Sequence, residues 1–170
     1  MSDGAGKLAL GAGSTRNLTL DAVSVKDVTL SADFTLDAAP STGSTYVGLI
    51  ARSGGAGNYL VRAWMHTNGS VWIVVQRGSA VLSSYQVPGL TRGAGDAFTL
   101  MVDVSGDASA TISAKVWKKG TDEPAGWQTS FTDTAGIASA GAIGVHASRA
   151  SSSTSAGVVT VDDFRVVDNG

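Results

Sequence analysis

Hydrophobic and polar residues alternate along several stretches of the chain. Residues 26–36 (KDVTLSADFTL) put aliphatic or aromatic residues at every second position, with Asp, Thr and Ser between them. Residues 97–104 (AFTLMVDV) and 110–117 (ATISAKVW) repeat this period of two. Such a period is typical of a β-strand with one face on a core and the other toward solvent. Each of these stretches is therefore predicted to be a half-buried strand.

A predicted hairpin lies at residues 58–77 (NYLVRAWMHTNGSVWIVVQR), where Asn68-Gly69 joins two apolar-rich runs. Asn-Gly is the preferred pair for a two-residue type I′ turn, because both central residues need positive φ. That loop would place Trp64 opposite Ile73 and Met65 opposite Trp72. One face would then carry Leu60, Arg62, Trp64, His66, Val71, Ile73, Val75 and Arg77. The opposite face would carry Val61, Ala63, Met65, Trp72, Val74 and Gln76, so we interpret Trp72 as a core residue.

The other segments also predict short strands. They are residues 7–10, 16–20, 45–52, 80–87, 127–132, 141–148 and 158–167, whereas residues 134–140 are weakly patterned and suit a single helical turn. Strands at this spacing, without a long amphipathic helix, favour a sandwich or barrel. We predict an all-β fold, an antiparallel β-sandwich of two sheets packed face to face. It would form one domain over residues 1–170, with a loose N-terminus at 1–6.

Composition and charge exclude several function classes. Charged residues make up 15% of the chain, the net charge is −2 and no basic run exceeds Lys118-Lys119, so nucleic-acid binding has little support. No apolar run is long enough to insert into a membrane. Cysteine is absent, which excludes disulfides and thiolate nucleophiles. Residues 1–10 lack the features of a signal peptide, so either the chain is not exported by that route or a signal has been removed.

The sequence also argues against catalysis and against zinc. Glycoside hydrolases need two carboxylic acids at a fixed spacing, and Glu123 is the only glutamate. Asp162 and Asp163 are adjacent in a predicted strand, so they should point to opposite faces. His66 and His146 are far apart and lack the H-E-x-x-H pattern of a zinc site. We predict a protein that is not an enzyme, and a hydrolase fragment remains the least favoured alternative.

Trp64 is the centre of the predicted binding site. Sugars present flat C–H faces that stack on indole rings, while arginine and histidine bind their hydroxyl groups. The predicted hairpin places Arg62, His66 and Arg77 beside Trp64, and Arg52 could join them from the end of the preceding strand. The alternatives are that Trp64 is a core residue and that Arg52 is a lone surface charge. Trp117 is outward by alternation, and we expect it to pack under the 118–126 loop against Trp127.

Several segments, taken together and in order, resemble a known family. They are YVGLIAR, NYLVRAWM followed by GSVWIVVQR, AKVWKKGTDEPAGWQTSFTD, AGAIGVHAS and VDDFRVVD, and they span most of the chain between Asp27 and Val166. This combination resembles the concanavalin A-like, laminin-G-type jelly-roll domains. It is most similar to those in minor tail proteins of phages that infect actinobacteria and in secreted actinobacterial proteins. The resemblance implies a β-sandwich, and often glycan recognition or adhesion.

The resemblance also implies a candidate metal site. Many jelly-roll binding domains use an aspartate in the last strand as a ligand of a structural calcium ion, which takes several oxygen ligands. Asp162 and Asp163 occupy that place, and Asp33 or backbone carbonyls could complete the shell. The alternative is that these aspartates face solvent or that one pairs with Arg165.

Together these features predict a non-catalytic recognition module. It would bind a carbohydrate at a host or cell surface, as part of a phage virion (tail) or as an extracellular protein. The alternative is a structural virion decoration or assembly module that binds neighbouring protein subunits, including other copies of itself.

Overall fold

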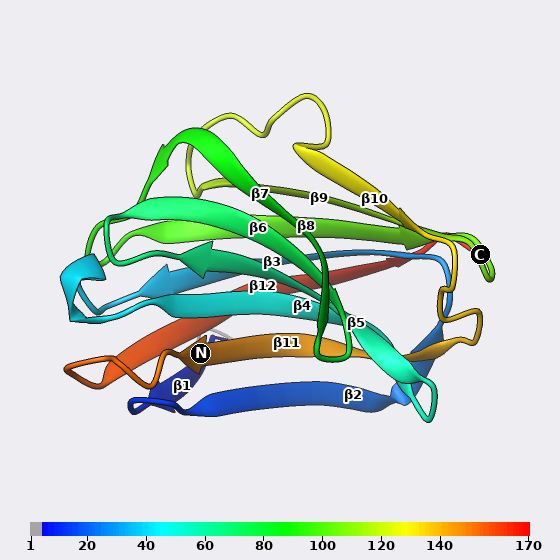
Figure 1. Cartoon of the computed structure of the whole chain (residues 1–170), viewed down its shortest axis with the longest axis horizontal. Coiled ribbons are helices and arrows are strands. Elements are labelled where there is room, and N and C mark those ends of the chain that lie inside the picture. The colour runs from blue at the N-terminus through cyan, green and yellow to red at the C-terminus, as the bar shows by residue number, and fades with distance from the viewer. Residues whose placement is uncertain (1–4) are drawn as a thin grey trace.

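Two six-stranded antiparallel sheets pack face to face in the computed structural model, which describes residues 5–170 (Figure 1). The first sheet has the order β1-β12-β3-β8-β9-β10 and the second β2-β11-β4-β5-β6-β7. The predicted all-β sandwich is therefore confirmed. A 3-10 turn at Pro40–Thr42 is the one helical element in the described part. Nowhere in that part is there a helix that could cross a bilayer.

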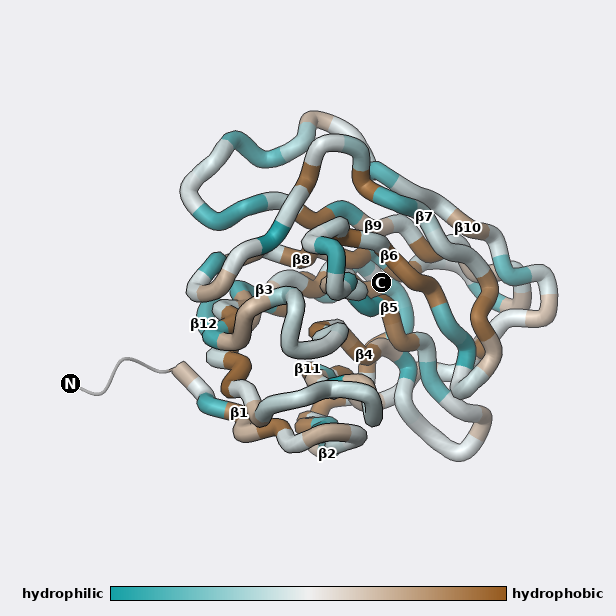
Figure 2. The backbone as a smooth tube through the Cα atoms, turned by 60° about the vertical axis from the view of Figure 1, so that its left-hand side comes forward, coloured by the Kyte–Doolittle hydropathy of each residue, from teal (hydrophilic) through white to brown (hydrophobic). Residues whose placement is uncertain are grey.

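The strands of the two sheets have the following bounds. The first sheet consists of β1 (Gly6–Leu10), β12 (Gly157–Asp168), β3 (Val28–Leu36), β8 (Ala97–Ser105), β9 (Ala110–Lys118) and β10 (Thr129–Asp133). The second consists of β2 (Thr15–Val25), β11 (Gly141–Arg149), β4 (Thr45–Gly54), β5 (Gly57–Met65), β6 (Ser70–Arg77) and β7 (Ala80–Thr91). β1 and β2 form one long edge of the sandwich, and β10 and β7 the opposite edge (Figures 1 and 2).

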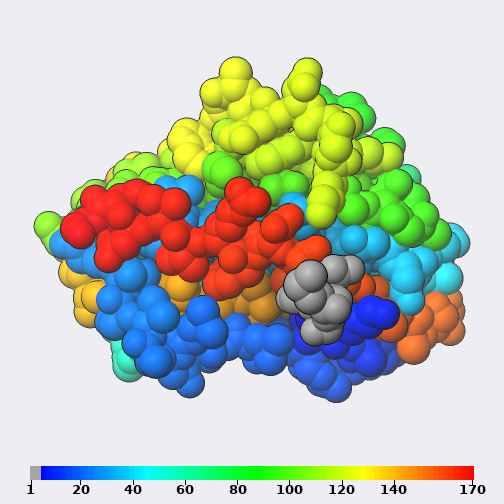
Figure 3. All heavy atoms as spheres, turned by 180° about the vertical axis from the view of Figure 1, so that it is seen from behind, coloured from blue at the N-terminus to red at the C-terminus, as the bar shows by residue number. Residues whose placement is uncertain are grey.

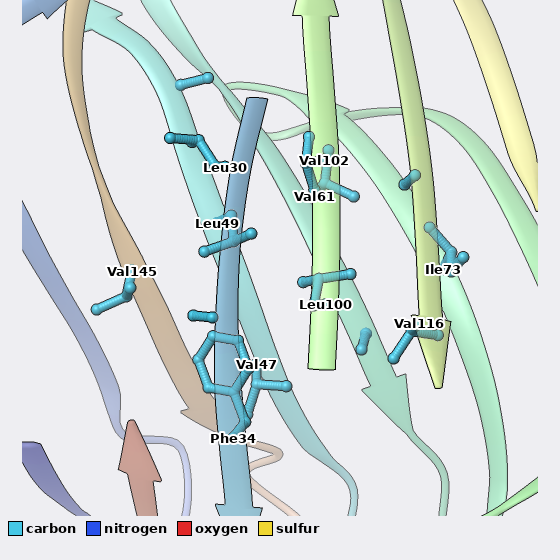
Figure 4. Close-up of a cluster of buried hydrophobic side chains, with 14 of the residues drawn as sticks. Leu30, Phe34, Val47, Leu49, Val61, Ile73, Leu100, Val102, Val116 and Val145 are labelled. Atoms are coloured by element: carbon cyan, nitrogen blue, oxygen red, sulfur yellow. The ribbon is translucent and has the colours of Figure 1, made fainter. Parts of the chain in front are cut away.

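The core lies between the sheets and follows the alternation seen in the sequence. Phe34 of β3 and Leu100 of β8 are fully buried, and they face Val47 and Val61 of the second sheet (Figure 4). Burying one such side chain contributes about 1.5–3 kcal/mol. Because successive strand residues point to opposite faces, burying one set leaves the other set to form the outer faces of the sandwich.

The β5–β6 hairpin forms as predicted, but its register differs by one residue. Its loop has three residues, because the His66 N–H donates to the Ser70 carbonyl, and Gly69 has a φ of 86°. The Asn68 side chain accepts the Ser70 N–H at 2.9 Å. A three-residue loop ending in a left-handed glycine is the next most common hairpin connection. Trp64 therefore pairs with Trp72 instead of Ile73, and every side chain of β6 lies on the opposite face from the one predicted.

Three smaller predictions also need correction. Residues 134–140 contain turns and bends rather than a helical turn. The strands predicted at 16–20 and 80–87 extend to Thr15–Val25 and Ala80–Thr91. The predicted loose start at 1–6 falls partly outside the described residues, because 1–4 are not described, and Gly6 already belongs to β1.

The segment between β9 and β10 folds back over the outer face of the first sheet (Figure 3). Lys115 lies beneath it, 8% exposed, with Nζ 5.9 Å from the Trp117 ring and 5.1 Å from the Trp127 ring. Its Nζ donates to the Pro124 carbonyl at 3.1 Å and pairs with Glu123 at 2.5 Å. The predicted packing of Trp117 under this loop is thus seen, with a lysine between the two indoles.

Candidate functional site

A row of aromatic rings lies on the outer face of the second sheet. Tyr46 comes from β4, Trp64 from β5 and Trp72 from β6, and each is half-buried. The ring centroids of Tyr46 and Trp64 are 5.8 Å apart, with an interplanar angle of 21°. Those of Trp64 and Trp72 are 6.1 Å apart, at 39°. We call these three residues, with Arg62 and His66, the aromatic strip.

The strand register explains why these rings meet. Tyr46 is the direct partner of Trp64 across β4 and β5, and Trp64 is the partner of Trp72 across β5 and β6. Directly opposed residues on one face of a sheet are close neighbours, and aromatic pairs of this kind stabilise it. His66 follows β5, and its ring lies 5.0 Å from the Trp64 ring. The strip is therefore built mainly on the middle of a sheet, which holds it rigidly.

His66 offers a hydrogen-bond donor to the strip. Its Nδ1 accepts the Asn68 N–H at 3.4 Å and lies 3.3 Å from the Thr67 hydroxyl. Because Nδ1 is the acceptor, the neutral ring carries its proton on Nε2.

Arg62 adds a positive charge without a protein partner. Its guanidinium lies over the Tyr46 ring, 4.7 Å from the centroid. Within residues 5–170 its Nε atom is buried and has no hydrogen-bond partner, and the same holds for Nε1 of Trp64. Desolvation by burial lowers the pKa of Arg62 below its ordinary value. A buried donor without a partner costs about 1–3 kcal/mol.

A polar cluster lies beside Arg62 on the neighbouring strands. His146 of β11 contacts the Asn17 Oδ1 through Nδ1 at 2.7 Å and the Ser148 hydroxyl through Nε2 at 3.0 Å. An amide oxygen can only accept, so Nδ1 carries the proton and Ser148 donates to Nε2. Burial first, and then the charge of Arg62, lowers the pKa of His146 to about 4. The imidazole is therefore neutral at physiological pH.

Gly48 keeps the surface open between Arg62 and His146. It is the cross-strand partner of Arg62 on one side and of His146 on the other. A Cβ atom at this position would lie 2.7 Å from the Val61 carbonyl oxygen and 3.2 Å from Cγ of Arg62. Glycine thus allows the strands to approach and leaves the guanidinium uncovered from that side.

Two of the predicted strip residues lie elsewhere, which corrects the sequence interpretation. Arg52 has a φ of 51° at a bulge of β4 and is 1% exposed. Its guanidinium pairs with Asp27 at 3.0 Å and donates to the carbonyls of Lys26, Ile137 and Gly106. The bulge turns the side chain inward, so Arg52 joins loops at one end of the sandwich instead of the strip.

Arg77 is also on the other side of the sheet. Its partner across the hairpin is Tyr59, a core residue, and its Nη1 pairs with Asp133 at 2.8 Å. The same nitrogen donates to the Ala135 carbonyl. The one-residue change in register places Arg77 there. It has the opposite effect on Trp72, which was predicted to be core but is half-buried on the strip, with its Nε1 donating to the Ser70 hydroxyl at 3.2 Å.

A lysine lies among the aspartates predicted to bind calcium, and it contacts two of them, Asp33 and Asp163. Asp162 and Asp163 form a bulge in β12, with φ of 49° at Asp163. Lys119 Nζ lies 2.7 Å from Asp33 and 3.9 Å from Asp163, and Arg165 lies 3.6 Å from Asp163. Within the described part, no group of three or more acidic, histidine or cysteine residues could hold a metal ion. The ammonium group of Lys119 thus lies between two of the carboxylates that such a site would use, and calcium binding stays a prediction.

Sequence reasoning found Arg62, Trp64 and His66 but missed the rest of the surface. The sequence pattern gives no sign that Tyr46, Asn17, His146 and Ser148 lie beside the hairpin. They reach it only through the order β2-β11-β4-β5, which brings distant segments side by side. One signal was available for Trp72. Val71, Ile73 and Val75 alternate as an aliphatic set that matches a core face better than Trp72 and Gln76 do.

Comparison with known proteins shows the fold. The chain matches no known family profile and no curated protein sequence. Among solved structures it is similar to the carbohydrate-binding module CBM66 from Bacillus subtilis, with a TM-score of 0.54, 13% identity, and 95% of this chain and 94% of that chain covered. It is also similar to the metal-free carbohydrate recognition domain of Emp46p, with a TM-score of 0.60, 12% identity and coverages of 98% and 88%.

An enzyme is among the similar structures as well. A native glycosidic hydrolase has a TM-score of 0.63 and 12% identity, with 100% of this chain and 80% of that chain covered. At these identities the likeness concerns architecture alone. The chain therefore has the concanavalin A-like and galectin-like jelly-roll fold, which lectins, carbohydrate-binding modules and some carbohydrate-active enzymes share.

Proposed function

We propose that this protein is a non-catalytic module that binds glycan through the aromatic strip. The observation that carries the proposal is the row of three aromatic rings on adjacent strands, with the guanidinium of Arg62 beside it. Indole and phenol rings offer flat surfaces for the C–H faces of sugars, and fixed polar groups at their edges set orientation. The carbohydrate-binding neighbours of the same fold support this function.

The chemistry of the strip suits recognition better than bond cleavage. Asp21 is the only acidic residue in the strands of the second sheet, so the strip lacks the carboxylate pair that glycosidases place around the scissile bond. His146 and Ser148 are hydrogen-bonded like a base and a nucleophile. However, acyl transfer also needs N–H groups aimed at a developing oxyanion. β11 lies between β2 and β4, so its N–H groups face those strands along most of its length. They are therefore not free to stabilise an oxyanion beside Ser148.

We further propose that binding takes place at a virion or cell surface. The support is the resemblance of the sequence segments to phage tail and secreted actinobacterial domains. In such a setting a rigid β-sandwich can present the strip to a polysaccharide while its other faces contact the rest of the particle.

One observation favours a second candidate, a structural module that binds neighbouring protein subunits. β2 is an edge strand, and its Leu18 and Leu20 are 53% and 48% exposed. They line a hollow of about 200 Å3 together with Val145, Val161 and Phe164. An exposed apolar edge of this kind is a common place for association. Under this alternative the protein would form stable oligomers or particles without binding glycan.

A paired binding experiment separates the two candidates. The wild-type protein would be applied to a glycan array and to purified bacterial cell-wall polymers, alongside Trp64→Ala and Trp127→Ala. Trp127 is 43% exposed in the segment between β9 and β10, which covers the first sheet, and it serves as the matched control. Glycan binding that is lost in Trp64→Ala and kept in Trp127→Ala supports the proposal. Absence of binding to every glycan, with a concentration-independent oligomer in light scattering, favours the structural module.

A further inference from the structure

We infer that the glycan bound at the aromatic strip is acidic and that Arg62 receives its oxyanion, most naturally the carboxylate of a uronic acid. The inference rests on the proposed glycan-binding function and specifies its ligand class. It follows from the charge distribution of the sheet and from the surroundings of one guanidinium.

Acidic residues are distributed unevenly between the two sheets. The strands of the first sheet contain Asp33, Asp103, Asp133, Asp162, Asp163 and Asp168. Those of the second contain only Asp21, near the far end of β2. Although the protein has a net charge of −2, the face with the strip therefore presents a cation without a carboxylate to neutralise it. A negatively charged ligand meets attraction there, whereas the outer face of the first sheet is rich in carboxylates.

Arg62 differs from the other arginines of the chain, all seven of which lie within the described residues. The buried ones are each hydrogen-bonded: Arg52 to Asp27, Arg92 to loop carbonyls and Arg149 to Thr42 and Thr45. The more exposed arginines also have partners. Arg16 donates to the Thr15 carbonyl, Arg77 pairs with Asp133, and Arg165 pairs with Asp163. Nε lacks a partner in Arg62, Arg92 and Arg149 alike. Among residues 5–170, however, Arg62 is the one arginine whose whole guanidinium has neither a hydrogen bond nor an ion pair.

A half-buried guanidinium without a partner is costly unless something else neutralises it. Burial removes water from the charge, and the Tyr46 ring only partly compensates for that loss. Proteins place arginine at such sites where a planar oxyanion is to be bound, because its donors match a carboxylate with two parallel hydrogen bonds. An anion at the accessible edge of the guanidinium would supply the partner that Arg62 lacks.

The groups around Arg62 leave room for such a ligand and do not compete for it. Gly48 has no side chain to cover the guanidinium from the β4 side. His146 is neutral and has both ring nitrogens engaged with Asn17 and Ser148. A uronic acid stacked on Trp64 would place its carboxylate toward Arg62, which precedes Trp64 by two residues on the outer face of β5.

The test compares acidic polysaccharides with their neutral counterparts. Polygalacturonate, alginate and hyaluronan would each be paired with the carboxyl-reduced polymer, which keeps the linkage and removes the charge, and dextran sulfate would serve as the sulfate probe. Binding is measured by affinity electrophoresis or calorimetry for wild type, Arg62→Met and Arg62→Lys. Arg16→Gln is the matched control, because Arg16 is an exposed arginine of β2 that points to the other side of the sheet.

We expect at least one carboxylated polymer to bind, and its reduced form to bind at least about tenfold more weakly, as is usual when a charged hydrogen bond is lost. Arg62→Met should weaken binding of the carboxylated polymer by a similar factor. Arg62→Lys should weaken it less, and Arg16→Gln should change it little. Arg62-dependent binding of dextran sulfate alone would also support an oxyanion ligand and identify it as sulfate. Equal binding of reduced and native polymers, unaffected by Arg62→Met, would overturn the inference while leaving glycan binding intact. Binding of no glycan at all would instead contradict the proposed function.

Discussion

Trp64 and Trp72 lie directly opposite each other on the outer face of the β5–β6 hairpin, with ring centroids 6.1 Å apart. This pairing depends on the three-residue loop at 67–69, in which Gly69 adopts a left-handed conformation. A two-residue loop would have sent Trp72 to the other face and left Trp64 beside aliphatic residues. The width of the aromatic strip is therefore set by a single residue in a turn.

The loop can be tested by changing its glycine. Gly69→Ala should destabilise the protein by about 1–2 kcal/mol, because a φ of 86° is strained for a residue with a Cβ atom and the Cβ would lie 3.4 Å from the Arg92 carbonyl. Chemical denaturation measures the change in the free energy of unfolding. Gly126→Ala is the control, since a Cβ there meets nothing within 4 Å, and its effect should stay within about 0.5 kcal/mol. Equal effects of the two substitutions would contradict the assigned turn.

Arg52 should contribute strongly to stability although it has no role in binding. Arg52→Met removes the ion pair with Asp27 and leaves the carbonyls of Lys26, Ile137 and Gly106 without their donor. We expect a loss of about 3–5 kcal/mol in the free energy of unfolding, as for other broken buried pairs. Arg165→Met, at an arginine whose side chain is 74% exposed, should change it by less than about 0.5 kcal/mol. A nearly neutral Arg52→Met would disprove the structural role.

The stability of the protein should fall in mildly acidic solution because of His146. Its pKa is lowered to about 4 in the folded protein, against 6.5 ordinarily, so between these values the unfolded chain binds the proton more tightly. The histidine then contributes stability at neutral pH that is lost as the pH falls from about 6.5 to about 4, at most about 3 kcal/mol. Aspartates with a lowered pKa, such as Asp96 with its hydrogen bond to Lys118, lose their contribution below that window.

Denaturation curves between pH 7.5 and pH 4.5 check this behaviour. The wild-type free energy of unfolding should decrease with each step, while His146→Gln, which cannot take up the proton, should show a much flatter dependence. A wild-type profile that is flat over this range, or equally steep in both proteins, would show that His146 is not held neutral by its surroundings.

Calcium provides a further test of the charge arrangement around β12. Lys119 joins Asp33 to Asp163, so we expect the melting temperature to be the same in millimolar calcium and in excess chelator. If removing Lys119 (Lys119→Met) makes the melting temperature calcium-dependent, the ammonium group occupies what would otherwise be a cation site. A clear calcium dependence in the wild type would instead restore the calcium ligands predicted from the sequence.

The alternating strands and the sandwich could be predicted because a period of two directly reports which face of a strand is buried. The length of the hairpin loop could not, since Asn-Gly serves both two-residue and three-residue loops and only the neighbouring strands decide between them. The inward turn of Arg52 depends on a bulge that leaves no sequence signal. Likewise, His146 and Arg62 meet only because β11 and β5 flank the same strand, which is a property of the topology.

The most direct test of glycan binding at the strip is a nuclear magnetic resonance titration of the four indole N–H signals, assigned with single Trp→Phe variants. The glycan that binds most strongly in the array experiment would be added to labelled protein. We predict that the signals of Trp64 and Trp72 shift on addition. Those of Trp117, on β9 of the first sheet, and of Trp127, in the segment after β9, should stay unchanged. Shifts confined to Trp117 and Trp127, or no shift in any indole despite binding, would contradict the account.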